Sequence, residues 1–342
     1  MSQLRVGVIG CGSIAKFRHL PEYGANKNVD IVAVCDVVES RAKEMAENYG
    51  AAAYTDYKDV IADKTIDVIS VCLPNYLHAP VSIAAADAGK HVLCEKPMAT
   101  SREEAEQMIA AAEKSGTKLM IAHNQRFVSS HEKAKEIIES GSIGKIYSFR
   151  TAFGHGGPEG WSIDGRDSWF FNKEKAFIGA MGDLGVHKTD LIRYLLGEDI
   201  VEVAGFVESS AKEGTDIDDN ATCILKSDSG IIGTLAASWS YNTDQDNSTV
   251  IYAEKAILRL EDDPDYALIV QYTNGEVVNY KLDAIQTNED GGQTTSHVID
   301  HFVDAIVNNT EVPVSGEEGM KSLEVVLAAL ESNQNKTIVK LS

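Results

Sequence analysis

The segment LRVGVIGCGSIA, residues 4–15, decides the fold that the sequence predicts. An apolar, β-branched run is followed directly by a glycine turn, GCGSIA (residues 10–15), and then by a helical pattern over 14–25. Gly10 permits a tight turn, Gly12 lets the backbone approach a pyrophosphate, and the alanine that ends the motif allows close packing of helix on strand. The N-terminus of that helix would add N–H donors and positive partial charge. The segment therefore predicts the first βα unit of a dinucleotide-binding domain.

The next apolar run, VDIVAVCD (residues 29–36), ends in an acidic residue. A carboxylate at the end of the second strand can accept a hydrogen bond from the 2′-hydroxyl of an adenosine ribose, so Asp36 strengthens the dinucleotide hypothesis. The same charge would repel a 2′-phosphate, and NAD is therefore favoured over NADP. Arg41 would partly offset that repulsion if it faced the same site, although a solvated helix face is the simpler interpretation of this residue.

Apolar runs alternate with helical patterns up to about residue 124. The runs are almost entirely apolar, as expected for parallel strands that helices cover on both faces. The expected strands lie at 4–9, 29–36, 52–56, 67–73, 91–96 and 118–124, and the expected helices at 14–25, 38–49, 57–63, 78–89 and 101–115. These elements predict an N-terminal Rossmann domain, built on a parallel sheet, over residues 1–123.

The pattern changes after residue 124. Helices are expected near 130–139, 182–197, 296–309 and 316–334, with a loop rich in Gly, Pro and Trp over 154–175. Residues 201–282 are typical of strands, and the tetrapeptides SDSG and TNGE within them are hairpin turn signals. We therefore expect an α/β protein whose second domain, residues 124–342, is an α+β unit with a large, open, mostly antiparallel sheet.

The composition restricts the class of partner. The 342 residues contain 52 Asp and Glu but 31 Lys and Arg, which gives a net charge of −21. Such an excess disfavours nucleic-acid backbones and anionic membranes as partners. The amino end has no basic leader and no apolar run approaches the length of a bilayer span, so a cytoplasmic protein is expected. The five cysteines form no close pair and no CxxC motif, which favours reduced thiols and no metal site.

Six short motifs, in this order, resemble the glucose–fructose oxidoreductase / inositol dehydrogenase family, abbreviated Gfo/Idh/MocA. They are the glycine turn at 10–15, Pro74-Asn75 with His78, AGKH at 88–91, Glu95-Lys96-Pro97, Asn124 with Arg126, and GDLGVH at 182–187. The closing stretch at 301–332 is also similar, so the resemblance extends over nearly the whole chain. Its specific part is the Glu-Lys-Pro tripeptide followed later by D-x-x-x-H, whereas the glycine turn alone is not specific.

The resemblance implies which residues perform the chemistry. Lys96, Asp183 and His187 would face the nicotinamide and the substrate, and the open sheet would join subunits into a homodimer or homotetramer. Lys96 follows a predicted strand, and ligands of open α/β sheets lie beyond the carboxyl ends of the strands. Asp183 and His187 share one face of a predicted helix, where the carboxylate can orient the imidazole and tune its pKa. A surface ion pair or a metal pair is the alternative, but the spacing shows no third metal ligand.

The remaining candidates follow from the strand ends and from the resemblance. The expected cofactor contacts are Gly10, Gly12, Ser13, Ile14, Asp36, Arg41, Leu73, Pro74, Asn75, His78, Glu95, Lys96 and Arg126. The expected substrate contacts are Lys96, Arg166, Trp169, Asp183 and His187. A tether between the domains is the alternative role for Arg126, and loop packing is the alternative for Arg166 and Trp169.

These residues predict reversible hydride transfer between a carbinol carbon and the nicotinamide of NAD. His187 would accept the hydroxyl proton, Asp183 would hold its ring, and Lys96 would stabilise the developing oxyanion, although Lys96 is the other candidate for the proton acceptor. The expected substrate is a small sugar, inositol or related polyol. Two alternatives stay open, namely a glycosidase that oxidises its substrate transiently and retains NAD, and an NAD-sensing regulator without catalysis. The intact trio of polar residues argues against the regulator.

Overall fold

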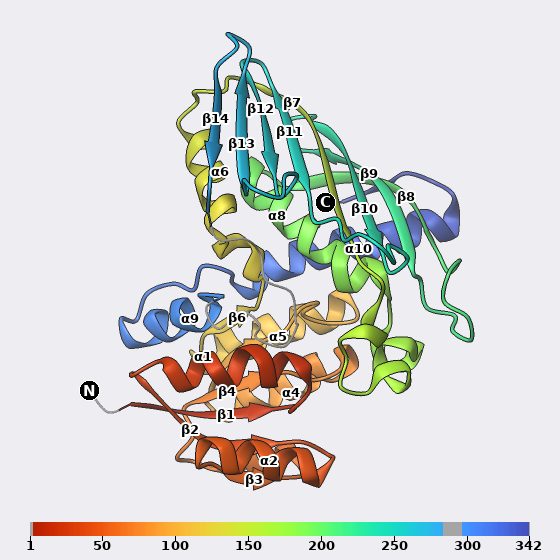
Figure 1. The fold of residues 1–342 in the computed structure, drawn as a ribbon. Coiled ribbons are helices and arrows are strands. Elements are labelled where there is room, and N and C mark those ends of the chain that lie inside the picture. The colour runs from red at the N-terminus through yellow and green to blue at the C-terminus, as the bar shows by residue number, and fades with distance from the viewer. Residues whose placement is uncertain (1–2, 283–295, 342) are drawn as a thin grey trace.

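The computed structural model describes residues 3–282 and 296–341 (Figure 1). Its first part is a six-stranded parallel sheet in the order β3-β2-β1-β4-β5-β6. The strands are β1 (Leu4–Ile9), β2 (Val29–Cys35), β3 (Ala52–Tyr54), β4 (Val68–Val71), β5 (His91–Cys94) and β6 (Leu119–Ile121). The strand order reverses between β1 and β4, so the predicted Rossmann topology is confirmed.

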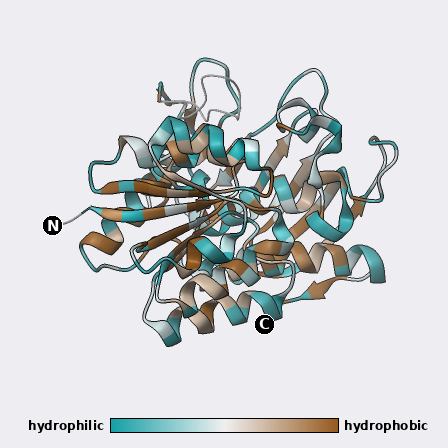
Figure 2. Cartoon of the chain, turned by 90° about the horizontal axis from the view of Figure 1, so that it is seen from below, coloured by the Kyte–Doolittle hydropathy of each residue, from teal (hydrophilic) through white to brown (hydrophobic). Residues whose placement is uncertain are grey.

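Helices enclose this sheet, and Figure 2 shows the apolar strands lying between helices with hydrophilic residues on their outer faces. The helices are α1 (Leu20–Ala25), α2 (Glu39–Tyr49), α3 (Tyr57–Ala62), α4 (His78–Asp87) and α5 (Arg102–Ser115). The predicted helix over 14–25 begins as a π-helical turn, Ala15–His19, that continues into α1. Helix α5 begins after Ser101, whose side chain accepts a hydrogen bond from the backbone N–H of Glu104 and so caps the helix.

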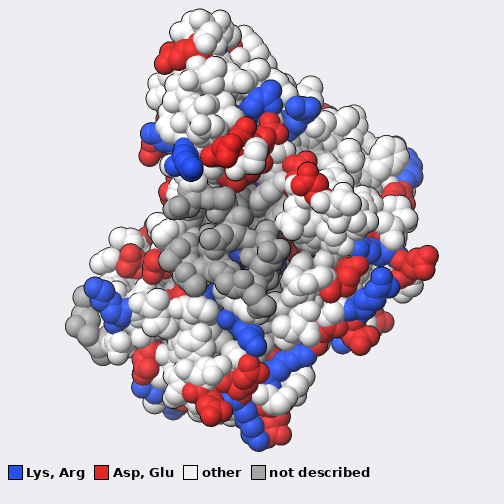
Figure 3. All heavy atoms as spheres, viewed as in Figure 1, with Lys and Arg blue, Asp and Glu red and all other residues white. Residues whose placement is uncertain are grey.

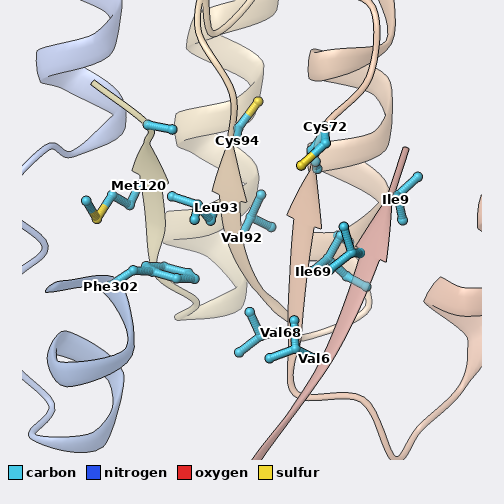
Figure 4. Close-up of a cluster of buried hydrophobic side chains, with 14 of the residues drawn as sticks. Val6, Ile9, Val68, Ile69, Cys72, Val92, Leu93, Cys94, Met120 and Phe302 are labelled. Atoms are coloured by element: carbon cyan, nitrogen blue, oxygen red, sulfur yellow. The ribbon is translucent and has the colours of Figure 1, made fainter. Parts of the chain in front are cut away.

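The core of the first domain lies between the sheet and its helices. Figure 4 shows Val92 of β5 on the side of Ile69 of β4, Leu93 of β5 on the side of Met120 of β6, and the ring of Phe302 beside Met120. All five are at least 98% buried. Phe302 belongs to helix α9 (Val298–Val307), close to the carboxyl end of the chain. Burial of such a side chain contributes about 1.5–3 kcal/mol, so α9 helps to stabilise the first domain.

The second sheet has nine strands in the order β14-β13-β12-β11-β7-β10-β9-β8-β15. Strands β7 and β10 pair in parallel and every other pair is antiparallel, so the predicted open, mostly antiparallel sheet is confirmed. The strands are β7 (Ile146–Gly154), β8 (Ile200–Glu208), β9 (Asn220–Ser227), β10 (Ile232–Ser238), β11 (Thr249–Ala253), β12 (Ala256–Leu260), β13 (Leu268–Tyr272), β14 (Val277–Tyr280) and β15 (Val339–Lys340).

Helices lie on one face of this sheet (Figure 1). They are α6 (Ser129–Glu139), α8 (Val186–Leu196) and α10 (Gly316–Asn335); the short α7 (Lys173–Ala176) lies in the long loop that follows β7. Helix α10 contributes Leu323 to the core of the first domain and Val325 to the core of the second. The division of the chain at residues 123 and 124 therefore stays a prediction, because its last helices pack against both cores.

The face of the molecule in the orientation of Figure 1 carries charges of both signs. On the face that Figure 3 shows, Lys and Arg are interspersed with Asp and Glu. In the part of the chain that the structure describes, no helix has the length and apolarity needed to cross a membrane.

Candidate active site

A cavity lies where the carboxyl ends of β1, β4 and β5 meet the second domain, and it is called the central cavity below. It brings together most of the predicted contacts. Those that line it are Gly12, Ser13, Ile14, Leu73, Asn75, His78, Glu95, Lys96, Trp169, Asp183 and His187. Those outside its lining are Gly10, Asp36, Arg41, Pro74, Arg126 and Arg166.

The two glycines of the turn serve different purposes. Gly10 has a φ of 97°, and a Cβ on it would lie 2.1 Å from the carbonyl oxygen of Cys72, so only glycine fits there. A Cβ on Gly12 would meet nothing within 4 Å. Gly12 therefore exposes its backbone to the central cavity, next to Ser13 and Ile14. This open backbone at the start of a helix fits a dinucleotide pyrophosphate.

Asp36 is attached to the glycine turn, although it does not line the cavity. Its Oδ2 accepts a hydrogen bond from the backbone N–H of Cys11 (2.9 Å), and its Oδ1 accepts one from Val38 (2.8 Å). The simpler interpretation of Arg41, a solvated helix face, does not match the structure. The guanidinium of Arg41 instead forms a two-pronged ion pair with Asp164, in the loop that follows β7.

The Lys96–Asp183 ion pair joins the domains at the wall of the cavity. Lys96 follows β5, and its Nζ donates to the Oδ1 and to the backbone oxygen of Asp183, both at 2.9 Å. The indole N–H of the fully buried Trp239 donates to Oδ2 of the same carboxylate at 3.1 Å. The lysine side chain keeps 15% of its surface exposed, against 6% for the aspartate. The amine is therefore fixed by charge-assisted bonds while part of the side chain faces the cavity.

His187 lies one turn further on, at the start of α8. It is 8% exposed, and its Nδ1 has no hydrogen-bond partner among the described residues. The pKa of His187 is lowered well below 6.5, first by burial and then by the charge of Lys96. The ring is therefore neutral near pH 7. We expected Asp183 to hold this ring, but the carboxylate binds Lys96 and Trp239, which approach it from other elements.

The metal pair was the alternative interpretation of Asp183 and His187. Within residues 3–282 and 296–341, no group of three or more His, Cys, Asp or Glu side chains is placed to hold a metal ion.

The helix that carries Asp183 and His187 differs from the expectation, because Met181–Gly185 forms a π-helical turn that continues into α8. Single π-helical turns inside α-helices occur frequently at functional sites.

Glu95 directly precedes Lys96 at the carboxyl end of β5. Its Oε1 lies 2.9 Å from Nε2 of His19, whose Nδ1 lies 2.7 Å from the hydroxyl of Ser70. Burial alone would raise the pKa of Glu95, but the hydrogen bond and charge of His19, with the charge of Lys96, lower it to about 2. The pKa of His19 rises to about 10 although burial opposes this, because Cys72 and Glu95 favour its charged form. Glu95 is therefore an anion next to Lys96.

His78 and Asn75 hold the two neighbouring loops. The ring nitrogens of His78 each lie 2.7 Å from a backbone oxygen, Nδ1 from that of Pro97 and Nε2 from that of Leu73. The amide of Asn75 donates to the backbone oxygen of Ala176 at 2.8 Å, which links the first domain to α7. These side chains line the cavity and also fix the backbone that follows β4 and β5.

Arg126 has the arrangement of a tether. Its Nε and Nη2 donate to the two oxygens of Asp190, both at 2.7 Å, and Nη2 also donates to Glu318 at 2.8 Å. The ion pair lies outside the central cavity and joins the segment after β6 to α8 and α10. Of the two roles considered for Arg126, this geometry matches the tether rather than the cofactor contact.

Arg166 and Trp169, the two candidate substrate contacts in the loop that follows β7, differ in their position relative to the cavity. Arg166 is exposed and outside the cavity lining, whereas Trp169 lines the cavity and stacks on Phe170 with ring centroids 3.9 Å apart. The lining also includes Phe153, Gln125 and Gln245, which sequence reasoning missed. Phe153 lies near the end of β7, directly before the Gly- and Trp-rich loop, and this position was an available signal. The glutamines carry no signal in the sequence.

Two models of one protein family match this chain. A model of the Gfo/Idh/MocA oxidoreductase family, with an NAD-binding Rossmann fold, matches residues 4–123, and the model of the Gfo/Idh/MocA C-terminal domain matches residues 131–259. The chain belongs to this family of oxidoreductases. The predicted family, its enzyme class and its NAD-binding Rossmann domain are thereby confirmed.

Individual relatives are dehydrogenases of sugars and inositols. A myo-inositol 2-dehydrogenase of Thermotoga maritima is 27% identical over 344 residues, which cover 99% of this chain and 98% of the relative. A levoglucosan dehydrogenase of Pseudarthrobacter phenanthrenivorans is 37% identical over 209 residues, but the match covers 58% of this chain and 52% of the relative. A solved structure of levoglucosan dehydrogenase in complex with NADH and levoglucosan has a TM-score of 0.87, with 27% identity and 99% of both chains covered.

Proposed function

We propose that this chain is an NAD-dependent dehydrogenase that oxidises a secondary alcohol of a sugar, inositol or related polyol. One observation carries the proposal: the Lys96–Asp183 ion pair and the imidazole of His187 line the same cavity as the glycine turn. Membership of the oxidoreductase family supports it, as do the sugar and inositol dehydrogenases among the relatives.

The first domain would hold the cofactor. Gly12, Ser13 and Ile14 present open backbone for the pyrophosphate, and Asp36 stands behind the turn for the adenosine ribose. Leu73 and Asn75 line the same cavity at the end of β4. When bound, NAD supplies the hydride acceptor.

The proton is handled by the chain itself. His187 is neutral near pH 7 and its ring lines the cavity, so it accepts the hydroxyl proton of the substrate. Lys96 donates a hydrogen bond to the oxygen on which negative charge develops. Asp183 and Trp239 hold Lys96 in place for this task. Asp183 thus acts through the lysine rather than through the histidine.

The substrate end of the cavity suits an uncharged polyhydroxylated ring. Phe153 and Trp169 offer aromatic side chains for its C–H groups, and the amide of Gln245 offers a donor and an acceptor for its hydroxyls. The charge of Lys96 is already balanced by its carboxylate partner. We therefore expect neutral sugars and inositols to be better substrates than sugar acids or sugar phosphates.

Absorbance of NADH tests the proposal. Purified protein is mixed with NAD and a panel of inositols, aldoses, sugar acids and sugar phosphates, with Lys96→Met alongside and Lys114→Met, an exposed lysine, as the control. A rise with a neutral member that Lys96→Met loses and Lys114→Met keeps would support the dehydrogenase. Binding of NAD without a rise for any member would contradict it and favour the glycosidase that retains NAD, or the sensor.

We further propose that the chain forms a homodimer or homotetramer through the open face of the second sheet. Phe206, Ile224 and Ile232, on the neighbouring strands β8, β9 and β10, are 66%, 53% and 52% exposed on the face opposite the helices. Exposed apolar patches of this kind mark interaction sites. Light scattering should give a multiple of the 37.0 kDa chain mass, and a smaller mass for Ile224→Asp. A wild-type mass of one chain would contradict this proposal.

A further inference from the structure

The loop of residues 155–172, called the clamp loop here, crosses from the second domain onto the glycine turn of the first. The hydroxyl of Ser13 donates to the backbone oxygen of Trp161 (3.1 Å) and accepts a hydrogen bond from the backbone N–H of Ile163 (3.1 Å). Lys212 holds the same loop through an ion pair with Glu159 (2.6 Å). Figure 1 shows the segment after β7, in yellow-green, descending beside the first domain. The position of the loop over the dinucleotide site is therefore fixed on two sides.

These contacts place Asp164 near Arg41, at the end of the site where Asp36 follows β2. Asp164 lines the central cavity and forms the two-pronged ion pair with Arg41. Arg41 belongs to α2, which follows Asp36 directly, and the hydrogen bond with Asp164 and the charge of Asp36 both raise the pKa of Arg41. The guanidinium thus pairs with a carboxylate of the second domain and is also within the electrostatic influence of Asp36 in the first.

We propose that Asp164 makes the cofactor site reject the 2′-phosphate of NADP. It engages the only arginine that α2 contributes, and it adds a second negative charge to that of Asp36. The proposal rests on the proposed function, because it presumes that a nicotinamide dinucleotide binds in the central cavity.

Asp36 alone does not decide the choice between the cofactors. An acidic residue at this position selects NAD through the ribose hydroxyl, whereas a nearby arginine accommodates a 2′-phosphate, and this chain has both. Two neighbouring cations are engaged as well, since Lys43 pairs with Glu39 (2.7 Å) and Lys16 with Glu44 (3.0 Å). The state of Arg41 is therefore decisive, and Asp164 sets it.

Direct binding of NAD and NADP to the full chain, by isothermal titration calorimetry, tests the inference. Asp164→Asn should bind NADP about tenfold or more tightly than the wild type does, because a like charge is removed and Arg41 is released. Its affinity for NAD should stay within about twofold, since NAD lacks the phosphate. The matched control is Asp167→Asn, an exposed acid of the same loop outside the cavity lining, which should change neither affinity.

A double-mutant cycle identifies the partner of the phosphate. In the wild-type background Arg41→Ala should not tighten NADP binding, because it leaves Asp164 without its partner, and in the Asp164→Asn background it should abolish the gain. An unchanged NADP affinity in Asp164→Asn, or equal shifts for NAD and NADP, would overturn the inference, the second because it would show that Asp164 only secures the loop. A wild type that binds neither cofactor would overturn the proposed function with it, whereas NAD binding without the expected shift would overturn this inference alone.

Discussion

Two ion pairs of the same chemistry follow neighbouring strands of the first sheet. Lys96 follows β5 and pairs with Asp183, and Arg126 follows β6 and pairs with Asp190. The first pair lines the central cavity and keeps its lysine 15% exposed, whereas the second lies outside the cavity with its side chains 8% and 1% exposed. Residue type alone does not separate a candidate catalytic cation from a tether. Position relative to the cavity does.

The largest expected effect belongs to the pair in the cavity. Lys96→Met should lower kcat/KM by about 10²–10⁴, the range for positioned acid–base and oxyanion groups. The melting temperature should change little, because Asp183 keeps its hydrogen bond from Trp239 and can take up water from the cavity. Steady-state NADH formation and thermal unfolding, measured on the same sample, check both parts. A loss of activity that follows a loss of folded protein would contradict this assignment.

The tether should show the opposite result. Arg126→Met leaves Asp190 buried without its main partner, and breaking a buried ion pair in this way costs about 3–5 kcal/mol of unfolding free energy. The rate per folded molecule should remain near that of the wild type. Urea unfolding measures the loss, and the double variant Arg126→Met/Asp190→Leu should recover part of it because no unpaired charge remains. An unchanged unfolding curve for Arg126→Met would refute the comparison.

The charge of Lys96 should be detectable on His187. Burial and then Lys96 lower the pKa of His187 well below 6.5, so the ring stays neutral as the pH falls through the usual histidine range. In Lys96→Met the charge is gone while burial remains, and the pKa should rise without reaching that of an exposed histidine. NMR titration of the imidazole resonances in both proteins measures the shift. A wild-type titration near 6.5 would contradict the burial argument.

The smallest effect concerns a third buried cation. Lys188 is fully buried and donates to the backbone oxygen of Asn247 (2.6 Å), and burial lowers its pKa from 10.5 to about 7. Below pH 7 the amine is charged in both states, and between 7 and 10.5 only the unfolded chain is protonated, so stability rises with pH across that window. The gain in melting temperature from Lys188→Met should therefore be larger at pH 6 than at pH 9, by about 2 °C or more. Equal differences at the two pH values would contradict the shift.

Much of the fold could be predicted because its signals are local. Strand, glycine turn and helix follow one another over residues 4–25, and the hairpin turns SDSG and TNGE divide the second sheet into strands. The return of the chain could not be predicted in this way. Phe302 packs beside β6, which lies far from it in sequence, and no local pattern distinguishes its helix from one that stays with the second domain.

The same contrast holds for the candidate site. Gly12 and Lys96 were predicted because a motif or a strand end places them without knowledge of the other domain. The partners of Asp183 could not be predicted, because they come from different domains. Lys96 and Trp239 donate hydrogen bonds to its carboxylate, whereas the nearby His187 does not. Asp164 was missed for the same reason, since the Arg41 pair forms only when the second domain folds over the first.

The most direct test of the central claim separates binding from chemistry at Lys96. Single-turnover formation of NADH is measured with NAD at saturation, for the wild type and for Lys96→Met, after the affinity of each for NAD has been determined by fluorescence. The account predicts that Lys96→Met binds NAD nearly as well as the wild type but forms NADH about a hundredfold or more slowly. Recovery of the wild-type rate at saturating NAD would contradict it, because Lys96 would then only hold the cofactor.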